Sequence, residues 1–220
     1  MELKDIKNKI PGKIFDILTK DISMLTPSQE KSIKKGLFDH KSILVCSPTA
    51  SGKTLIAELA GLKIILEEGG KVIYIVPLRA LANEKYKEFS HRYKDLIKVA
   101  LSIGNLDSTD SYLMNYDFII CTAEKLDSLI RHHTPWLKYV KLVVIDEIHL
   151  LNDPERGPTL EILITMLRQI IPKAQLLALS ATIGNPTELA KWLNSELVQD
   201  DWRPVKLHKG IYYDGVIEFK

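Results

Sequence analysis

The sequence predicts an α/β fold in which a mainly parallel sheet carries helices on both faces. From residue 42 onward, short apolar runs rich in β-branched residues alternate with longer segments of helical periodicity. Gly, Ser, Thr and Asp gather where several of the apolar runs end. Alternation of this kind is typical of βαβ units, which bring parallel strands together. Because ligands of such folds bind beyond the carboxyl ends of the strands, we expect the functional residues there.

Length and composition narrow the class of protein. The chain has 220 residues, of which 45% are hydrophobic, so one domain with a full core is expected. The formal net charge is only +2, and any nucleic-acid site must therefore be a local patch. Cys46 and Cys121 are too few for a zinc site or a disulfide framework, which favours buried thiols in a reducing compartment. No apolar run approaches the roughly 18 residues of a membrane span, so we expect a cytoplasmic protein without membrane contacts.

The apolar periodicity gives the expected elements in order. Expected strands cover residues 42–46, 71–76, 98–103, 117–122, 141–146 and 175–180, and expected helices cover 53–67, 79–94, 123–132, 157–171 and 186–194. Before the first strand, Pro11 opens one helix and Thr26 caps another, with Pro27 at its first position. Gln29 lies three residues after Thr26, and this spacing is that of a capping box.

The tail predicts a small β extension. Val205-Lys206-Leu207 and Val216-Ile217-Glu218-Phe219 are short strand-like runs on either side of Tyr213-Asp214-Gly215, a hairpin-type turn signal. We therefore expect a domain over residues 1–203 and a short β extension at the domain boundary over residues 204–220.

A phosphate-binding loop is indicated between the first expected strand and its helix. The loop reads Ser47-Pro48-Thr49-Ala50-Ser51-Gly52-Lys53-Thr54, with Ser47 where the usual pattern has its first glycine. Small residues here, Thr49, Ala50, Ser51 and Gly52, let backbone N–H groups converge on phosphate oxygens, and the helix N-terminus adds positive potential. Lys53 is expected to reach the outer phosphates of ATP, and the Thr54 hydroxyl to hold Mg²⁺. The alternative is an ordinary strand-to-helix turn.

Two adjacent carboxylates end the strand expected at residues 141–146. Asp146 suits the outer sphere of Mg²⁺, and Glu147 suits a general base that orients and deprotonates an attacking water. An apolar run that ends in Asp-Glu is weak evidence by itself, since a helix-capping Asp gives the same letters. Together with the phosphate-binding loop about 90 residues earlier it predicts nucleotide hydrolysis, with Lys53, Asp146 and Glu147 as the catalytic set.

Three motifs give the chain a family resemblance. Ser47 to Thr54, Asp146-Glu147-Ile148-His149 and Ser180-Ala181-Thr182 resemble motifs I, II and III in the first RecA-like domain of superfamily 2 helicases. Further stretches are similar to the Ski family, and most of all to the archaeal Hel/Hjm group of repair DNA helicases: Pro77-Leu78-Arg79-Ala80-Leu81-Ala82, Thr122 to Leu129, Asp153 to Glu161 and Trp202-Arg203-Pro204-Val205. The resemblance covers roughly residues 10–219.

The resemblance implies roles for further residues. Gln29 matches the glutamine that reads adenine, although the capping box alone also explains it. Contacts with the sugar–phosphate backbone of a strand are implied for Arg79, Ala80, Thr122, Glu124 and Lys125. His149, Ser180 and Thr182 match positions that couple nucleotide state to strand binding. The alternatives are a solvated charge for Arg79, helix caps for Ser180 and Thr182, and a structural group for His149. Arg156 belongs to the family signature, and we assign it no chemistry.

The resemblance also implies the activity. A first RecA-like domain predicts ATP- and Mg²⁺-dependent 3′–5′ movement on single-stranded or forked DNA, in partnership with a second RecA-like domain that supplies an arginine finger. The sequence shows no second domain, so we expect a motor domain that is weakly active or inactive alone. An RNA helicase of the same family remains an alternative, because backbone tracking does not require reading of the 2′-OH. The other alternative is a nucleotide-dependent binding module that does not unwind nucleic acid.

Overall fold

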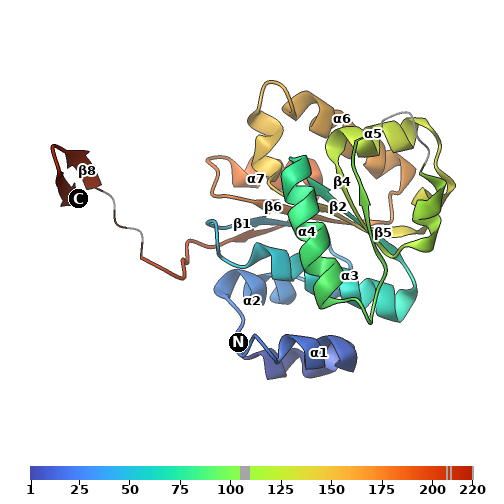
Figure 1. The fold of residues 1–220 in the computed structure, drawn as a ribbon, viewed down its shortest axis with the longest axis horizontal. Coiled ribbons are helices and arrows are strands. Elements are labelled where there is room, and N and C mark those ends of the chain that lie inside the picture. Colours follow the sequence, from blue (N-terminus) through green and yellow to red (C-terminus); the bar gives the residue numbers. More distant parts are fainter. Residues whose placement is uncertain (105–109, 207, 209, 220) are drawn as a thin grey trace.

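A sheet of seven parallel strands forms the centre of the molecule. The computed structural model describes residues 1–104, 110–206, 208 and 210–219. Within this part, the strands lie in the order β3-β4-β2-β5-β6-β1-β7, and all of their pairings are parallel. The expected parallel α/β architecture is therefore confirmed (Figure 1).

The bounds of the elements follow the sequence pattern closely. The strands are β1 Ile43–Cys46, β2 Lys71–Val76, β3 Val99–Ser102, β4 Phe118–Thr122, β5 Val140–Ile145, β6 Gln175–Ser180, β7 Glu196–Gln199, β8 Gly210–Tyr213 and β9 Val216–Phe219. The α-helices are α1 Gly12–Leu18, α2 Pro27–Lys34, α3 Lys53–Glu68, α4 Arg79–Arg92, α5 Ala123–Arg131, α6 Gly157–Ile170 and α7 Pro186–Leu193. Short 3-10 helices are η1 Leu3–Lys9, η2 Leu37–Asp39, η3 Ser111–Asn115, η4 Pro135–Tyr139 and η5 Ile148–Asn152.

Each central strand contributes to two hydrophobic cores. In β2, Val72, Tyr74 and Val76 pack into the core beneath α3 and α4, whereas Ile73 and Ile75 pack into the core beneath α5, α6 and α7. This follows from the strand geometry, in which successive side chains point to opposite faces. Burial on both faces explains why these strands read as continuous apolar runs. The expectation of helices on both faces is confirmed (Figure 1).

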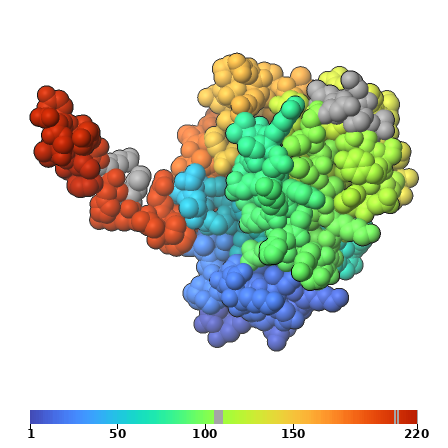
Figure 2. Space-filling view, in the orientation of Figure 1, coloured from blue at the N-terminus to red at the C-terminus, as the bar shows by residue number. Residues whose placement is uncertain are grey.

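The N-terminal helices extend the first of these cores. Buried side chains of η1 and α1, among them Leu3, Ile14 and Leu18, join the cluster beneath α3. The capping box of α2 is present, since Gln29 Oε1 accepts a hydrogen bond of 2.8 Å from the backbone N–H of Thr26. These N-terminal segments form the lower part of the body in Figure 2.

The terminal hairpin forms in a different register from the expected one. Its first strand is β8, not residues 205–207; Val205 is a bend, Lys206 has no regular structure, and Leu207 lies outside the described residues. The turn residues Asp214 and Gly215 both have positive φ, 44° and 80°, as a two-residue hairpin turn requires. Such a turn pairs the residues beside it, so Tyr213 faces Val216 and the strand starts at Gly210. The hairpin extends away from the body (Figures 1 and 2).

Strand β7 lies at one edge of the sheet. β7 was not expected; it pairs in parallel with β1 at the sheet edge, with Val198 buried.

Cys46 and Cys121 are buried free thiols, as expected, and burial raises their pKa to about 11 and about 12. In the part of the chain that the structure describes, no helix combines the length and apolar character needed to cross a bilayer.

Candidate nucleotide site and strand groove

The phosphate-binding loop follows β1 at the carboxyl edge of the sheet. Thr49 and Ala50 are exposed at its tip, and Ala50 and Gly52 adopt left-handed backbone conformations with φ of 62° and 84°. The Ser47 and Ser51 hydroxyls lie 2.7 Å apart and close the base of the loop. A Cβ on Gly52 would lie 2.4 Å from Gln29 Nε2, so this position requires glycine both for its φ and for space.

Helix α2 holds the loop from below. Thr26 Oγ1 donates a 2.9 Å hydrogen bond to the Ser51 carbonyl, and Gln29 Nε2 donates one of the same length to the Gly52 carbonyl. Gln29 is 3% exposed, and both ends of its amide are bonded within the protein. Gln29 therefore supports the loop and caps α2, and its contact with adenine stays a prediction.

Lys53 lies between the loop and the two carboxylates. Its Nζ donates to the carbonyls of Ser47 and Pro48 at 2.8 and 2.9 Å. Burial lowers the pKa of Lys53, while the nearby Glu147 and Asp146 act in the opposite direction. The structure therefore brings together Lys53, Asp146 and Glu147, the residues expected to carry the chemistry.

Glu147 has an unusual backbone and an unsatisfied side chain. It follows β5 with φ 52° and ψ 44°, a left-handed conformation that is rare outside glycine. Its Oε2 atom is buried without a hydrogen-bond partner among the described residues. Strain and an unpaired buried acceptor together are typical of functional positions. An acceptor in this state can take a proton from water.

His149 lies between the second and third motifs. Its Nδ1 accepts a 3.4 Å hydrogen bond from the Ala181 N–H and lies 3.3 Å from Glu147 Oε2. Ser180 is buried at the end of β6, and its carbonyl accepts a hydrogen bond from the Ser47 N–H. Thr182 is exposed, and α7 begins later, with Asn185 at its N-cap. Ser180 and Thr182 are therefore not helix caps, and the contacts of His149 and Ser180 are compatible with the predicted coupling.

A groove lies beside the nucleotide site at the ends of β2, β3 and β4. It encloses about 330 Å³ and is lined by Pro77, Leu78, Arg79, Gly104, Thr122, Glu124 and Arg156. Three of the residues predicted to contact a strand thus share one groove. Ala80 is exposed on α4 outside this lining.

Lys125 is only 1% exposed, and its Nζ lies 3.1 Å from the Asp110 carboxylate. The structure does not bring Lys125 to the groove, because its ammonium is held in the interior.

The segment after η5 explains part of the family signature. Asp153 Oδ1 accepts hydrogen bonds from the backbone N–H groups of Glu155 and Arg156, which lower the pKa of Asp153. A Cβ on Gly157 would lie 2.2 Å from the Leu151 carbonyl oxygen, so only glycine fits. These contacts fix the turn that presents Arg156 to the groove. No salt bridge of Arg156 within 4 Å is found among the described residues.

A small cavity connects the groove with the carboxylates. It has room for about 20 Å³, enough for a single water, and is lined by Glu124 and Arg156 as well as by Asp146 and Glu147. The groove and the acidic pair are therefore neighbours, with Glu124 and Arg156 lining both the groove and the cavity.

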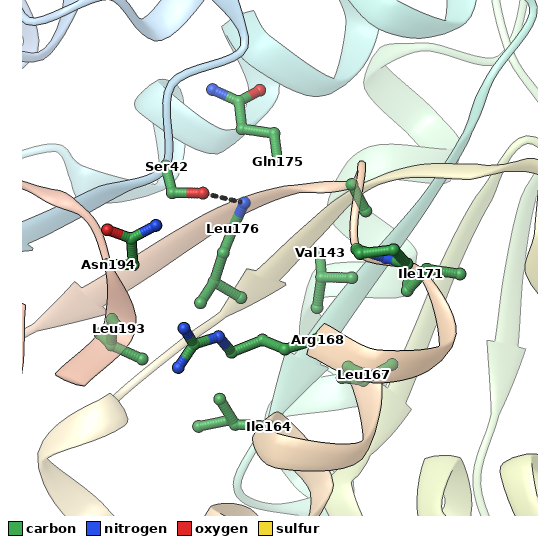
Figure 3. A pocket seen from close by; sticks show the side chains of 12 residues that line it. Ser42, Val143, Ile164, Leu167, Arg168, Ile171, Gln175, Leu176, Leu193 and Asn194 are labelled. Carbon is green, nitrogen blue, oxygen red and sulfur yellow. Dashed lines mark hydrogen bonds between the residues drawn. The ribbon is translucent and has the colours of Figure 1, made fainter.

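Another hollow lies at the opposite end of the strands. It encloses about 210 Å³, with Val143, Leu167 and Leu193 among its apolar walls (Figure 3). Its polar groups serve the fold: Ser42 Oγ accepts from the Leu176 N–H, and the Arg168 guanidinium donates to the Trp192 carbonyl at 2.7 Å. None of the predicted site residues lines it.

Tyr74 and Lys85 are site residues that the sequence analysis did not single out. The Tyr74 hydroxyl donates a 2.8 Å hydrogen bond to Asp146 Oδ2, and Lys85 Nζ lies 3.4 Å from Thr54 Oγ1. Burial and the charge of Asp146 raise the pKa of Tyr74 well above its usual value, while Thr54, which faces the same hydroxyl, acts in the opposite direction. The available signal for Tyr74 was a single hydroxyl in a run, residues 72–76, that is otherwise aliphatic.

The donor set fits a magnesium ion carried by a nucleotide. Among the described residues, no three His, Cys, Asp or Glu side chains converge as an all-protein metal site. Mg²⁺ in nucleotide sites commonly takes one or two protein oxygens and completes its shell with phosphate and water. The Thr54 hydroxyl and the Asp146 carboxylate, which face the same Tyr74 hydroxyl, match that demand.

Fold and site together define a P-loop nucleotide-binding domain with a groove beside the nucleotide site. Residues 26–189 match the family model described as DEAD/DEAH box helicase. The chain belongs to this family. The helicase resemblance drawn from the motifs is thereby confirmed.

Comparison with individual proteins supports the assignment. The chain is 52% identical over 209 residues to the ATP-dependent DNA helicase Hel308 of Pyrococcus abyssi, covering 94% of this chain and 29% of that protein. It is 53% identical over 216 residues to Hel308 of Methanocaldococcus jannaschii, covering 94% of this chain and 18% of that one. A crystal structure of the DUF1998 helicase MrfA bound to DNA and AMPPNP superimposes with a TM-score of 0.77 at 27% identity, covering 88% and 29%. The chain thus spans less than a third of these relatives.

Proposed function

We propose that this chain is the ATP-binding motor domain of an ATP-dependent DNA helicase. It binds ATP with Mg²⁺ at the loop of Ser47 to Thr54 and tracks the backbone of single-stranded or forked DNA along the groove at Arg79, Thr122 and Glu124. A second RecA-like domain completes the site, and movement runs 3′–5′ as in the family that the sequence resembles. The names of the Hel308 relatives favour DNA over RNA as the nucleic acid.

One observation carries the proposal. The phosphate-binding loop, the acidic pair and the groove share the carboxyl edge of one sheet, and a water-sized cavity is lined by residues of both the groove and the acidic pair. Proximity of this kind is what a motor needs, because hydrolysis must change the grip on the strand. A nucleotide-dependent binding module would not need a general base, a role open to Glu147 because its buried Oε2 makes no hydrogen bond among the described residues.

Substitution of Lys53 tests the nucleotide site. Lys53→Ala should weaken binding of a fluorescent ATP analogue, since hydrogen bonds to charged groups contribute about 1.5–3 kcal/mol, or roughly 10- to 150-fold in Kd. Lys63→Ala is the matched control, because Lys63 lies on the same helix but pairs with Glu67. Equal affinity of Lys53→Ala and wild type contradicts the assignment.

Comparison of nucleic acids tests the substrate. Single-stranded DNA should compete with a labelled DNA oligomer for the chain better than RNA of the same sequence, and binding should weaken as salt rises. Stronger competition by RNA would favour the RNA helicase alternative.

A further inference from the structure

The Tyr74 hydroxyl lies where the two predicted magnesium ligands meet. Asp146 is fixed at both carboxylate oxygens: Oδ1 accepts the Glu147 N–H at 3.0 Å, and Oδ2 accepts the Tyr74 hydroxyl at 2.8 Å. The Thr54 hydroxyl faces the same phenol oxygen. One side chain of β2 therefore touches both the helix that follows the phosphate-binding loop and the end of β5.

The ring of Tyr74 is held as firmly as its hydroxyl. The side chain is fully buried, and its ring packs against Phe89 at 5.8 Å and Phe118 at 6.1 Å between centroids. β2 pairs with β5 in register, with Tyr74 beside Val144, so the hydroxyl reaches Asp146 from the neighbouring strand. A packed ring on a central strand gives the hydroxyl little freedom to move, as a residue that orients a metal ligand requires.

We propose that Tyr74 is a positioning residue that orients the Asp146 carboxylate, and with it the Thr54 hydroxyl, for magnesium–nucleotide binding. The inference rests on the proposed function, because it presumes that Thr54 and Asp146 hold Mg²⁺. Tyr74 donates its proton to the ligand oxygen and makes no contact with the nucleotide itself. Loss of the hydroxyl frees Asp146 Oδ2 to rotate, and the ion meets a less ordered donor.

The test is the magnesium dependence of nucleotide binding by Tyr74→Phe. Affinity for a fluorescent ATP analogue is measured in EDTA and across a Mg²⁺ titration. Partners that orient metal ligands typically change metal affinity about 10–100-fold. We therefore expect at least a tenfold rise in the half-maximal Mg²⁺ concentration, with unchanged affinity in EDTA. A general loss of structure would weaken both.

Tyr93→Phe is the matched control. Tyr93 belongs to the same aromatic cluster, is equally buried, and donates its hydroxyl to the Glu58 carboxylate rather than to Asp146. It should keep the wild-type Mg²⁺ response. Thermal melting of both variants checks the fold. In an Asp146→Asn background, Tyr74→Phe should have no further effect on the Mg²⁺ response, since the residue acts through Asp146.

The outcomes separate this inference from the proposed function. If wild type binds the nucleotide equally well with and without Mg²⁺, the magnesium part of the proposed function fails and the inference falls with it. If wild type responds and Tyr74→Phe responds at the same Mg²⁺ concentration, only the inference is overturned. An equal shift in Tyr93→Phe, or an undiminished shift in the Asp146→Asn background, also overturns it.

Discussion

Glu147 has a strained backbone conformation next to the phosphate-binding loop and Asp146. A left-handed conformation at a non-glycine residue costs of order 1–3 kcal/mol and persists only where its surroundings impose it. Here the Glu147 N–H is fixed to Asp146 Oδ1, and the backbone of Asp146 is fixed to the Ile75 carbonyl. The neighbouring strand β2 therefore imposes the conformation that brings Glu147 beyond the end of β5.

Glu147→Gln should keep binding of ATP and slow its hydrolysis. The amide is nearly isosteric but cannot accept the proton of the attacking water, and a general base typically contributes about 10²–10⁴-fold. Steady-state phosphate release measures turnover, and a fluorescent ATP analogue measures binding. Glu155→Gln, an exposed carboxylate of the following turn, is the control. Unchanged turnover in Glu147→Gln would leave the acidic pair with a structural role only.

The residues of the site differ in how far the sequence alone could predict them. Lys53, Asp146 and Glu147 were predicted because their side chains follow apolar runs at the spacing their chemistry requires. Tyr74 was not, because its partner Asp146 is 72 residues away and only the pairing of β2 with β5 brings them together. Lys125 is the opposite case. The sequence predicted that it contacts a nucleic-acid strand, whereas the fold buries its ammonium against Asp110.

Helix α2 and the phosphate-binding loop act as one element of structure. Three residues of one turn, Thr26, Ser28 and Gln29, donate side-chain hydrogen bonds to the carbonyls of Ser51 and Gly52. These bonds fix the loop through its carbonyl groups. The capping box and a functional role of Gln29 are therefore compatible rather than exclusive.

Gln29→Ala separates the two roles of this residue by nucleotide selectivity. If Gln29 reads adenine, the variant should lose roughly fivefold in its preference for ATP over GTP, the worth of about one hydrogen bond. If Gln29 only supports the loop, affinity for both nucleotides should fall in parallel. Competition of ATP and GTP against a fluorescent analogue measures the ratio. Ser32→Ala, which removes a hydrogen bond within α2, is the control.

Elements could be predicted from the sequence where apolar residues mark them, and the prediction failed where they do not. The helices follow from the helical spacing of their apolar residues, and six of the sheet strands follow from short continuous apolar runs. β7 has only Val198 buried and no apolar run to mark it. The first strand of the hairpin was misplaced because the turn, rather than hydrophobicity, sets its register, and both of its strands are fully exposed.

The sheet order divides the carboxyl edge into two halves. Strands β3, β4 and β2 end at the groove, with Gly104, Thr122 and Pro77, whereas β5, β6 and β1 end at the nucleotide site. The alternation of strands and helices predicted a parallel sheet but not this order, since nothing local in the sequence specifies which strands become neighbours. The boundary between the halves lies between β2 and β5, which Tyr74 crosses through its hydrogen bond to Asp146.

The 220-residue chain by itself should bind ATP, hydrolyse it very slowly and leave duplex DNA intact. Phosphoryl transfer needs positive charge on the transferring group, and an arginine finger contributes about 10³–10⁵-fold in related NTPases. In the helicase family that finger belongs to a facing domain, and unwinding needs two domains that grip the strand in turn. Addition of the second domain should therefore raise turnover by orders of magnitude. Phosphate release with and without single-stranded DNA, compared between the chain and a longer protein, measures the difference.

Equal turnover of the two proteins would contradict this expectation and would direct attention to Arg156. Among the described residues, Arg156 is the arginine that lines the cavity beside Asp146 and Glu147. If Arg156→Ala then removed the activity of the isolated chain, the chain would supply its own cation. Arg168→Ala, whose guanidinium bonds the Trp192 carbonyl at the far end of the sheet, should leave turnover unchanged. Slow turnover that Arg156→Ala does not alter further is the result expected of a motor whose finger comes from elsewhere.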